Sequence, residues 1–112
     1  MVAGPLVRGR VYAARLQHID GEKYFLVVSN NRRNAALPQV VAVRLTTSPK
    51  PAIPSIVELG PAEVFAGRAI CDDITEVYVD EVRRDLGALT PAAMAAVNAG
   101  LKAALSLRDA DR

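Results

Sequence analysis

The sequence predicts a mainly β protein, a small barrel or sandwich of short strands followed by a short helix and a C-terminal α-helix. Two patterns support this fold class. Short runs of β-branched and aliphatic residues are separated by turn residues over most of the chain. Near residue 90 the spacing of apolar residues changes to that of a helix. With 112 residues, the chain is expected to form one domain, 1–112, with a single hydrophobic core.

The composition excludes several classes of protein. Hydrophobic residues make up 51% of the chain, which excludes wholesale disorder. The net charge of +2 is only a weak preference for polyanionic partners. Cys71 is the one cysteine, so an intrachain disulfide is impossible and a reducing compartment fits. No apolar stretch approaches the ~20 residues of a membrane helix, and we expect a cytoplasmic protein that does not contact a membrane.

Four strands are expected in the first half of the chain, at residues 8–16, 24–29, 40–47 and 55–59. Asp20-Gly21 is a typical turn between the first two strands. The second strand is apolar throughout, so both of its faces should be buried. Residues 30–34 are rich in asparagine and are interpreted as a turn.

Two more short strands, 67–71 and 75–79, are expected on either side of Asp72-Asp73. These two carboxylates could contact Mg²⁺, but a polar turn is the favoured interpretation, because adjacent strand residues point to opposite faces. One histidine and one cysteine at unrelated positions cannot form a zinc site. No metal and no cofactor is therefore expected, and Cys71 is expected in the core rather than as a nucleophile.

Two helices complete the prediction. Asp80 is expected to cap a short helix that ends near Leu86. Thr90-Pro91 is a typical start signal for the last helix, with a capping hydroxyl before a proline. The apolar stripe of this helix consists of Met94, Val97, Leu101, Ala104 and Leu105.

A candidate site follows from pairing strands 24–29 and 40–47 as an antiparallel hairpin. The register that matches their apolar faces places Ser29 opposite Val40 and Lys23 opposite Thr46. Arg44 then lies on the same face as Thr46. A cation and a hydroxyl suit an RNA phosphodiester, since cleavage without a metal needs charge stabilisation at the phosphorane and groups that move protons. Spacing alone leaves open that these are ordinary solvated residues at strand ends.

Five segments occur in an order that is typical of one family: RGRVY at 8–12, KYFLVVSN at 23–30, VVAVRLTT at 40–47, CDDIT at 71–75 and a closing helix at 89–107. On these motifs the sequence resembles the MazF/PemK family of toxins of type II toxin–antitoxin systems, and its mycobacterial-type members in particular. The resemblance implies an SH3-like barrel of the CcdB/MazF type, a homodimer and a MazE-like antitoxin as partner.

The resemblance also implies an activity. It is sequence-specific, metal-independent endoribonuclease cleavage of single-stranded RNA, such as mRNA, tRNA or rRNA, which arrests growth. The ribose 2′-OH attacks the phosphate, and the product is a 2′,3′-cyclic phosphate. The reactive arginine of the family falls on Lys23 and its reactive threonine on Thr46, the two residues that the hairpin register brings together.

Departures from the family pattern affect this candidate site. Lys23 keeps the positive charge but loses the bidentate fork of arginine. The loop at 17–22 is shorter than the corresponding loop of the family, which carries serine and glutamate. Glu22 and His18 are the candidate helpers in this loop, and Arg44 is a third candidate. Asp73 replaces the usual glutamine and is expected to change the base preference. The expected RNA-binding residues are Arg8, Ser29, Asn30, Thr47, Lys50, Asp73 and Thr75.

Two other functions remain as alternatives. A non-catalytic CcdB-like toxin that binds DNA gyrase would have the same fold, but it relies on an aromatic C-terminal tail. Residues 107–112 contain no aromatic residue, which counts against this alternative. A non-catalytic SH3-like adaptor is the third hypothesis.

Overall fold

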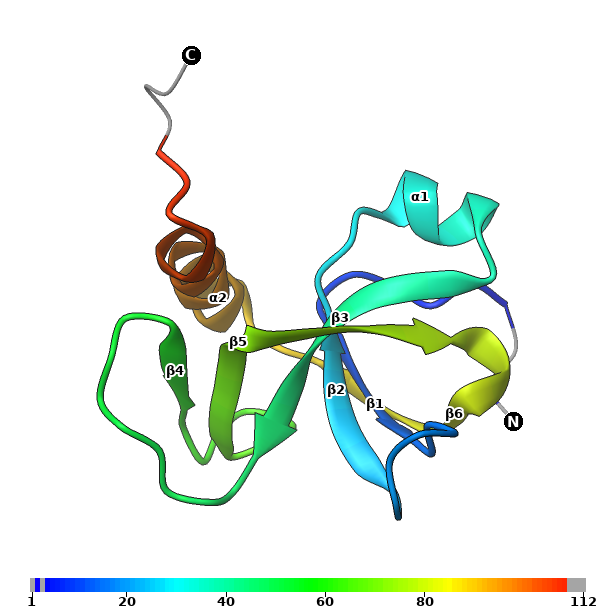
Figure 1. Ribbon diagram of the computed structural model, residues 1–112, viewed down its shortest axis with the longest axis horizontal. Helices are drawn as coiled ribbons and strands as arrows, with labels where there is room; N and C mark the ends of the chain where they lie inside the picture. The colour runs from blue at the N-terminus through cyan, green and yellow to red at the C-terminus, as the bar shows by residue number, and fades with distance from the viewer. Residues whose placement is uncertain (1, 3, 109–112) are drawn as a thin grey trace.

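The computed structural model describes residue 2 and residues 4–108 (Figure 1). Its strands are β1 (Arg10–Ala14), β2 (Lys23–Val27), β3 (Gln39–Thr46), β4 (Ile56–Leu59), β5 (Gly67–Tyr78) and β6 (Val82–Ala88). Its helices are α1 (Asn31–Ala36), the 3₁₀ turn η1 (Val79–Glu81) and α2 (Pro91–Leu105). No helix in the described part of the chain is long and apolar enough to span a membrane.

The strands form one antiparallel sheet in the order β4-β5-β3-β2-β1-β6. The sheet is strongly bent, so that β4 and β6 lie on opposite sides of the central strands (Figure 1). It stays open, because the edge strands β4 and β6 are each hydrogen-bonded on one side only. The prediction of a mainly β, barrel-like fold with a C-terminal helix is confirmed.

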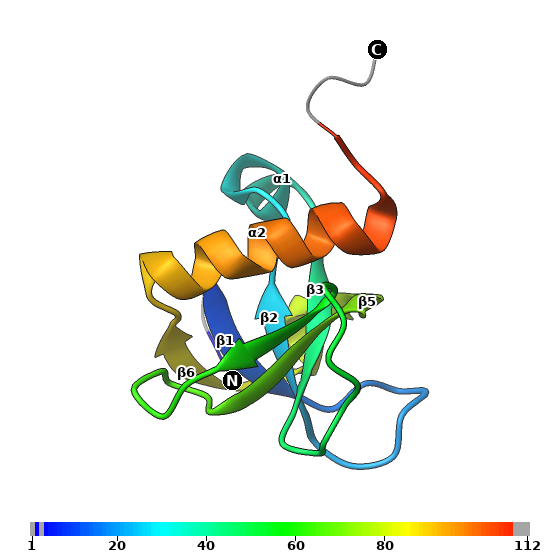
Figure 2. The same ribbon diagram turned by 90° about the vertical axis from the view of Figure 1, so that its left-hand side faces the viewer.

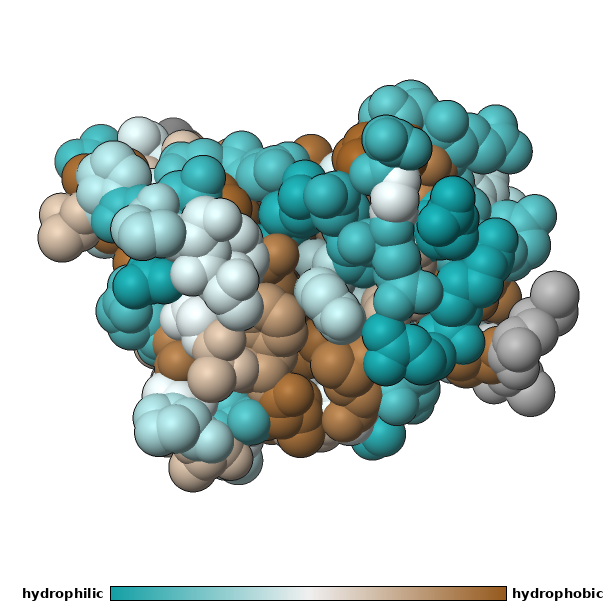
Figure 3. Space-filling view, turned by 90° about the horizontal axis from the view of Figure 1, so that it is seen from below, coloured by the Kyte–Doolittle hydropathy of each residue, from teal (hydrophilic) through white to brown (hydrophobic). Residues whose placement is uncertain are grey.

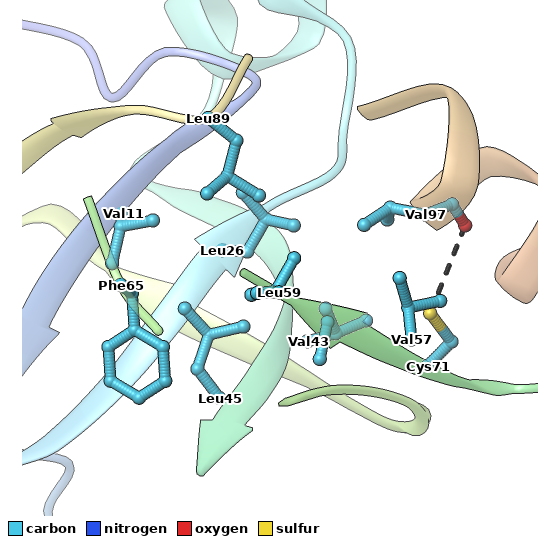
Figure 4. Packing of buried hydrophobic residues seen from close by; sticks show 11 residues of the cluster. Val11, Leu26, Val43, Leu45, Val57, Leu59, Phe65, Cys71, Leu89 and Val97 are labelled. Atoms are coloured by element: carbon cyan, nitrogen blue, oxygen red, sulfur yellow. Dashed lines mark hydrogen bonds between the residues drawn. The ribbon is translucent and has the colours of Figure 1, made fainter. Parts of the chain in front are cut away.

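Two apolar clusters lie on opposite faces of the β2–β3 hairpin. Leu26, Val43 and Leu45 belong to the cluster that α2 covers (Figures 2 and 4). Phe25 and Val27 alternate with Leu26 along β2 and belong to the second cluster. Both faces of β2 are therefore buried, as its continuous apolar sequence predicted.

Helix α2 begins as predicted. The Thr90 hydroxyl oxygen accepts a hydrogen bond from the Ala93 N–H at 3.2 Å, and Pro91 occupies the first turn. Glu63 adds a second anchor, because its carboxylate accepts hydrogen bonds from the N–H and the hydroxyl of Thr90. These bonds lower the pKa of Glu63. Val97 is fully buried and faces Cys71 across the helix–sheet interface (Figure 4).

The prediction of two strands flanking Asp72-Asp73 is wrong in one respect. The segment forms a single long strand, β5, which pairs with β3 over nearly its whole length. The three residues between Ile70 and Ile74 are accommodated by a register shift and not by a turn. The carboxylate of Asp72 accepts a hydrogen bond from the Ser55 hydroxyl.

The short helix predicted from Asp80 to Leu86 is also wrong. Only Val79–Glu81 is helical, and the residues that follow form β6, which pairs with β1. The unpaired edge of β1 offers backbone hydrogen bonds that a local capping pattern does not reveal. The predicted turn at 30–34 is instead the start of α1, because the Asn30 side chain accepts the Arg33 N–H at 2.9 Å.

Candidate functional site

The β2–β3 hairpin has the predicted register. Tyr24 pairs with Leu45 and Phe25 with Arg44, so the terminal residues Lys23 and Thr46 come next in the same register. At the other end the prediction fails. Ser29 does not pair with Val40, because its N–H donates to the Val41 carbonyl and its hydroxyl oxygen accepts the Val41 N–H.

A cavity of about 260 Å³ lies at this end of the hairpin. Its lining residues come from β2, β3 and their adjoining loops, and they are Glu22, Lys23, Tyr24, Arg44, Leu45, Thr46, Thr47, Ser48 and Phe65. It therefore brings together both candidate catalytic residues and two of the three candidate helpers. The end of β3 lies at the bottom of Figure 1, and Figure 3 views this lower side, where hydrophobic surface lies between more hydrophilic flanks.

The hydroxyl of Thr46 is oriented by its own chain. Thr46 Oγ1 accepts the backbone N–H of Ser48 at 3.1 Å. An oxygen that accepts this bond keeps its own proton available for donation to a ligand. Thr47 lies past the end of β3 and is exposed. Thr46 can therefore act as a hydrogen-bond donor to an anion in the cavity.

Glu22 is paired with a residue that the sequence analysis did not identify. Its carboxylate lies 2.7 Å from Nη2 of Arg84, which comes from β6. The same guanidinium is 3.5 Å from the hydroxyl of Tyr24. The hydrogen bond to Glu22 raises the pKa of Arg84. No local signal could have predicted this contact, because it depends on β6 lying beside β1 and not forming a helix.

Phe65 is a second residue that the sequence analysis missed. It lies in the loop between β4 and β5 and is largely buried. Its ring packs against Tyr24, with ring centroids 5.3 Å apart and planes tilted by 46°. The two aromatic rings form an apolar wall of a cavity that otherwise carries charged and hydroxyl groups.

His18 and Thr75 line a different cavity, of about 710 Å³. The other residues that line it are Gln17, Ile74, Glu76, Tyr78, Asp80 and Glu81. The structure thus separates His18 from the cavity that Lys23 and Thr46 line, whereas Glu22 stays within it.

Three of the expected RNA-binding residues lie beyond the opposite end of β2. Arg8 donates from Nε to the Val28 carbonyl at 3.0 Å and from Nη2 to the Asn98 side chain at 2.6 Å. Asn30 caps α1, and the Ser29 hydroxyl bonds Asn34. These contacts tie β2, α1 and α2 together. Lys50 is exposed in the loop after β3, and Asp73 is exposed in β5.

Cysteine and metal chemistry find no support in the described residues. Cys71 is fully buried, and burial raises the pKa of its thiol to about 11, so the reactive thiolate is scarce at neutral pH. In residues 2 and 4–108, no group of three or more His, Cys, Asp or Glu side chains is placed to hold a metal ion.

Sequence comparisons relate the chain to one family. The family model that matches residues 7–105 is described as PemK-like, MazF-like toxin of type II toxin-antitoxin system. Endoribonuclease MazF1 of Mycobacterium bovis is 43% identical over 101 residues, which are 90% of this chain and 93% of that protein. Endoribonuclease MazF4 of Mycobacterium tuberculosis has the same identity and coverage.

Solved structures agree with this relationship. A mycobacterial endoribonuclease in complex with its cognate antitoxin has a TM-score of 0.85 and 42% identity, over 92% of this chain and 97% of that chain. MazF in a MazE–MazF structure from Deinococcus radiodurans has a TM-score of 0.79 over 95% of this chain and 100% of that chain. Its identity is 19%, so it supports the fold alone.

Proposed function

Because the chain belongs to the PemK-like, MazF-like family of toxins of type II toxin–antitoxin systems, we propose that it is the endoribonuclease toxin of such a system. Residues 1–112 would form a single toxin domain that cleaves single-stranded RNA at specific sequences and so arrests growth. The observation that supports this proposal is that Lys23 and Thr46 both line one cavity at the ends of β2 and β3.

The proposed reaction uses the ribose 2′-OH as nucleophile. Its oxygen bonds to phosphorus as its proton passes to a base, the bond to the 5′-oxygen breaks, and the 5′-oxygen takes up a proton from water. A 2′,3′-cyclic phosphate and a 5′-OH result. The ammonium group of Lys23 stabilises the negative charge of the phosphorane. The Thr46 hydroxyl donates a hydrogen bond to a phosphate oxygen. Charge stabilisation and proton transfer by side chains need no metal ion.

Glu22 is the proposed proton acceptor. Its carboxylate is the one acidic group among the residues that line the cavity, whereas His18 lines the other cavity. A general base must lie within hydrogen-bond reach of the proton that it takes. The position of Glu22 next to Lys23 meets this requirement better than that of His18.

The proposed partners follow from the family. They are single-stranded RNA, a second copy of the chain and a MazE-like antitoxin. The mycobacterial relative with 42% identity was solved with its cognate antitoxin, which supports the last of these. The alternative of a CcdB-like gyrase poison is not favoured, since the relatives with 43% identity are named endoribonucleases.

Cleavage of transcripts by the purified protein in EDTA tests the proposal. We expect Lys23→Ala and Thr46→Ala each to lose cleavage by about 10²–10³-fold, as when one preorganised donor is removed. Lys23→Arg and Thr46→Ser keep the charge and the hydroxyl and should remain active. A substrate with 2′-deoxyribose at the scissile position should stay intact. Cleavage of that substrate, or full activity of both alanine variants, would overturn the proposed mechanism.

A further inference from the structure

Arg44 carries a buried polar atom without a partner. Its Nε is buried and has no hydrogen-bond partner in the described part of the protein. We infer that Arg44 is a second phosphate-binding residue, and that its guanidinium supplies the bidentate contact that Lys23 cannot make. The inference rests on the proposed function, because the phosphate is that of the RNA substrate.

The position of Arg44 fits this role. It lies two residues before Thr46 on β3, so both side chains are on the same face of the sheet. Arg44 pairs with Phe25 of β2 on one side and with Ile70 of β5 on the other. Its side chain is half-buried among apolar neighbours and lines the same cavity as Lys23.

The buried Nε donor of Arg44 destabilises the protein while it has no partner. Nearly all buried donors in folded proteins are paired, and an exception calls for an explanation. An unpaired buried donor loses the hydrogen bond that it would make with water, and the loss is larger for a charged group. A ligand with negative charge would satisfy Arg44 and recover this loss when it binds.

Two carboxylates, one that lines the cavity and one on β4, are each paired with another arginine. Glu22 forms its ion pair with Arg84 at 2.7 Å. On β4, Glu58 forms an ion pair with Arg68 at 3.0 Å. In residues 2 and 4–108 no carboxylate pairs with Lys23 or Arg44, so both cations of the cavity remain uncompensated.

The irregularity in β5 contributes to this arrangement. Val43 pairs with Ile74, but the next residue of β3, Arg44, pairs with Ile70. The residues in between, including Asp72, are therefore left out of the ladder at the position of Arg44. Asp72 bonds the Ser55 hydroxyl instead. Asp72 forms no ion pair with Arg44.

The two cations have complementary chemistry. Lysine acts as a compact point charge, whereas arginine presents several N–H donors in a planar fork that matches two phosphate oxygens. The phosphorane carries one more negative charge than the phosphodiester, so two cations stabilise it better than one. Arg44 transfers no proton, since a guanidinium stays protonated at neutral pH. It binds and orients the phosphate.

Binding of inorganic sulfate tests the anion site without RNA. The variants are Arg44→Met, Arg44→Lys and a control, Arg32→Met, at an exposed position in α1 beyond the opposite end of β2. Sulfate should raise the Tm of the wild type and of Arg32→Met, raise that of Arg44→Lys less, and leave that of Arg44→Met nearly unchanged. Without sulfate, Arg44→Met should have a higher Tm than the wild type, because the unpaired charge is gone. An equal sulfate response in Arg44→Met and wild type, or a lower Tm of Arg44→Met, would overturn the inference.

RNA cleavage separates this inference from the proposed function. Arg44→Met should lower kcat/KM by about 10²–10³-fold, and Arg44→Lys by about 10-fold because it keeps the charge but loses the fork. If Lys23→Ala is inactive while Arg44→Met cleaves like the wild type, the inference fails and the proposed function stands. If the wild type cleaves no RNA but sulfate binding still depends on Arg44, the anion site stands and the proposed function fails.

Discussion

Gly67 lies directly against the backbone of Thr46. A Cβ atom built on Gly67 would be 2.4 Å from the Thr46 carbonyl oxygen, closer than folded proteins allow. Gly67 also has a φ angle of +151°, which other residues rarely adopt. The end of β3 that carries the candidate catalytic hydroxyl therefore requires glycine in the neighbouring strand.

Gly67→Ala should displace Thr46. We expect a loss of about 1–3 kcal/mol of unfolding free energy from strain, and at least about 10-fold lower RNA cleavage. Gly60→Ala is the matched control, because Gly60 has a negative φ angle and a Cβ there would meet nothing within 4 Å. Denaturant unfolding and a cleavage assay measure both effects. If both variants behave alike, the close approach has no role in placing Thr46.

Removal of Arg84 should weaken cleavage through Glu22. In Arg84→Ala the Glu22 carboxylate loses its 2.7 Å ion pair and becomes free to pair with Lys23, which would neutralise the charge that binds phosphate. Stability should change little, because the pair is partly exposed. The adjacent Arg83→Ala serves as control, since Arg83 donates to the Asp80 carbonyl and not to Glu22.

A double-mutant cycle of Arg84→Ala with Glu22→Gln, measured as the affinity for the uncleavable 2′-deoxy substrate, checks this coupling without depending on Glu22 as the base. Arg84→Ala should have little further effect once Glu22 is neutral. Independent effects of the two substitutions would contradict the coupling.

Cys71 should make the protein less stable at alkaline pH. Burial raises the pKa of its thiol from 9.0 to about 11 in the folded state. Between these two pH values the unfolded chain releases the proton and the folded chain keeps it, so unfolding becomes more favourable as the pH rises. The loss should reach about 2–3 kcal/mol by pH 11, at 1.36 kcal/mol per pH unit. Below pH 9 this contribution is fully present.

Unfolding free energies of the wild type and Cys71→Ala, measured from pH 8 to pH 11, test this effect. The alanine variant is less stable overall because of the cavity it leaves, but its stability should fall less steeply above pH 9. Parallel curves for the two proteins would show that the Cys71 thiol does not cause the decline.

Gly100→Ala should destabilise the protein against the helix-propensity trend. Alanine in a helix interior is normally better than glycine by about 1 kcal/mol. A Cβ at Gly100, however, would lie 2.8 Å from both Cys71 Sγ and Val57 Cγ2, so α2 would have to move away from the sheet. Denaturant unfolding should show a net loss of about 1–3 kcal/mol. A gain in stability would mean that the helix–sheet interface adjusts freely.

Local sequence patterns determined a large part of this protein. The alternation at the end of β3, with Val43 and Leu45 on one face and Arg44 and Thr46 on the other, specified its register against β2, since a one-residue slip would exchange these two faces. That register is sufficient to place Lys23 beside Thr46, because both residues continue the same antiparallel pairing by one position. The start of α2 was equally clear, because Thr90-Pro91 satisfies helix N-terminal backbone groups within a few residues.

Tertiary structure decided what depends on distant partners. Residues 82–88 carry a helix-like capping signal, but they form β6 because the edge of β1 needs a hydrogen-bonding partner. Only this pairing puts Arg84 beside Glu22. The pairing of β5 with β3 brings Gly67 to Thr46, and the loop between β4 and β5 brings Phe65 to Tyr24. The unpaired Nε of Arg44 is likewise a property of the whole fold, since Glu22 and Glu58 form their ion pairs with Arg84 and Arg68 instead. Sequence periodicity reports which face of a strand is buried, whereas a charge balance in a cavity is set by segments that meet only after folding.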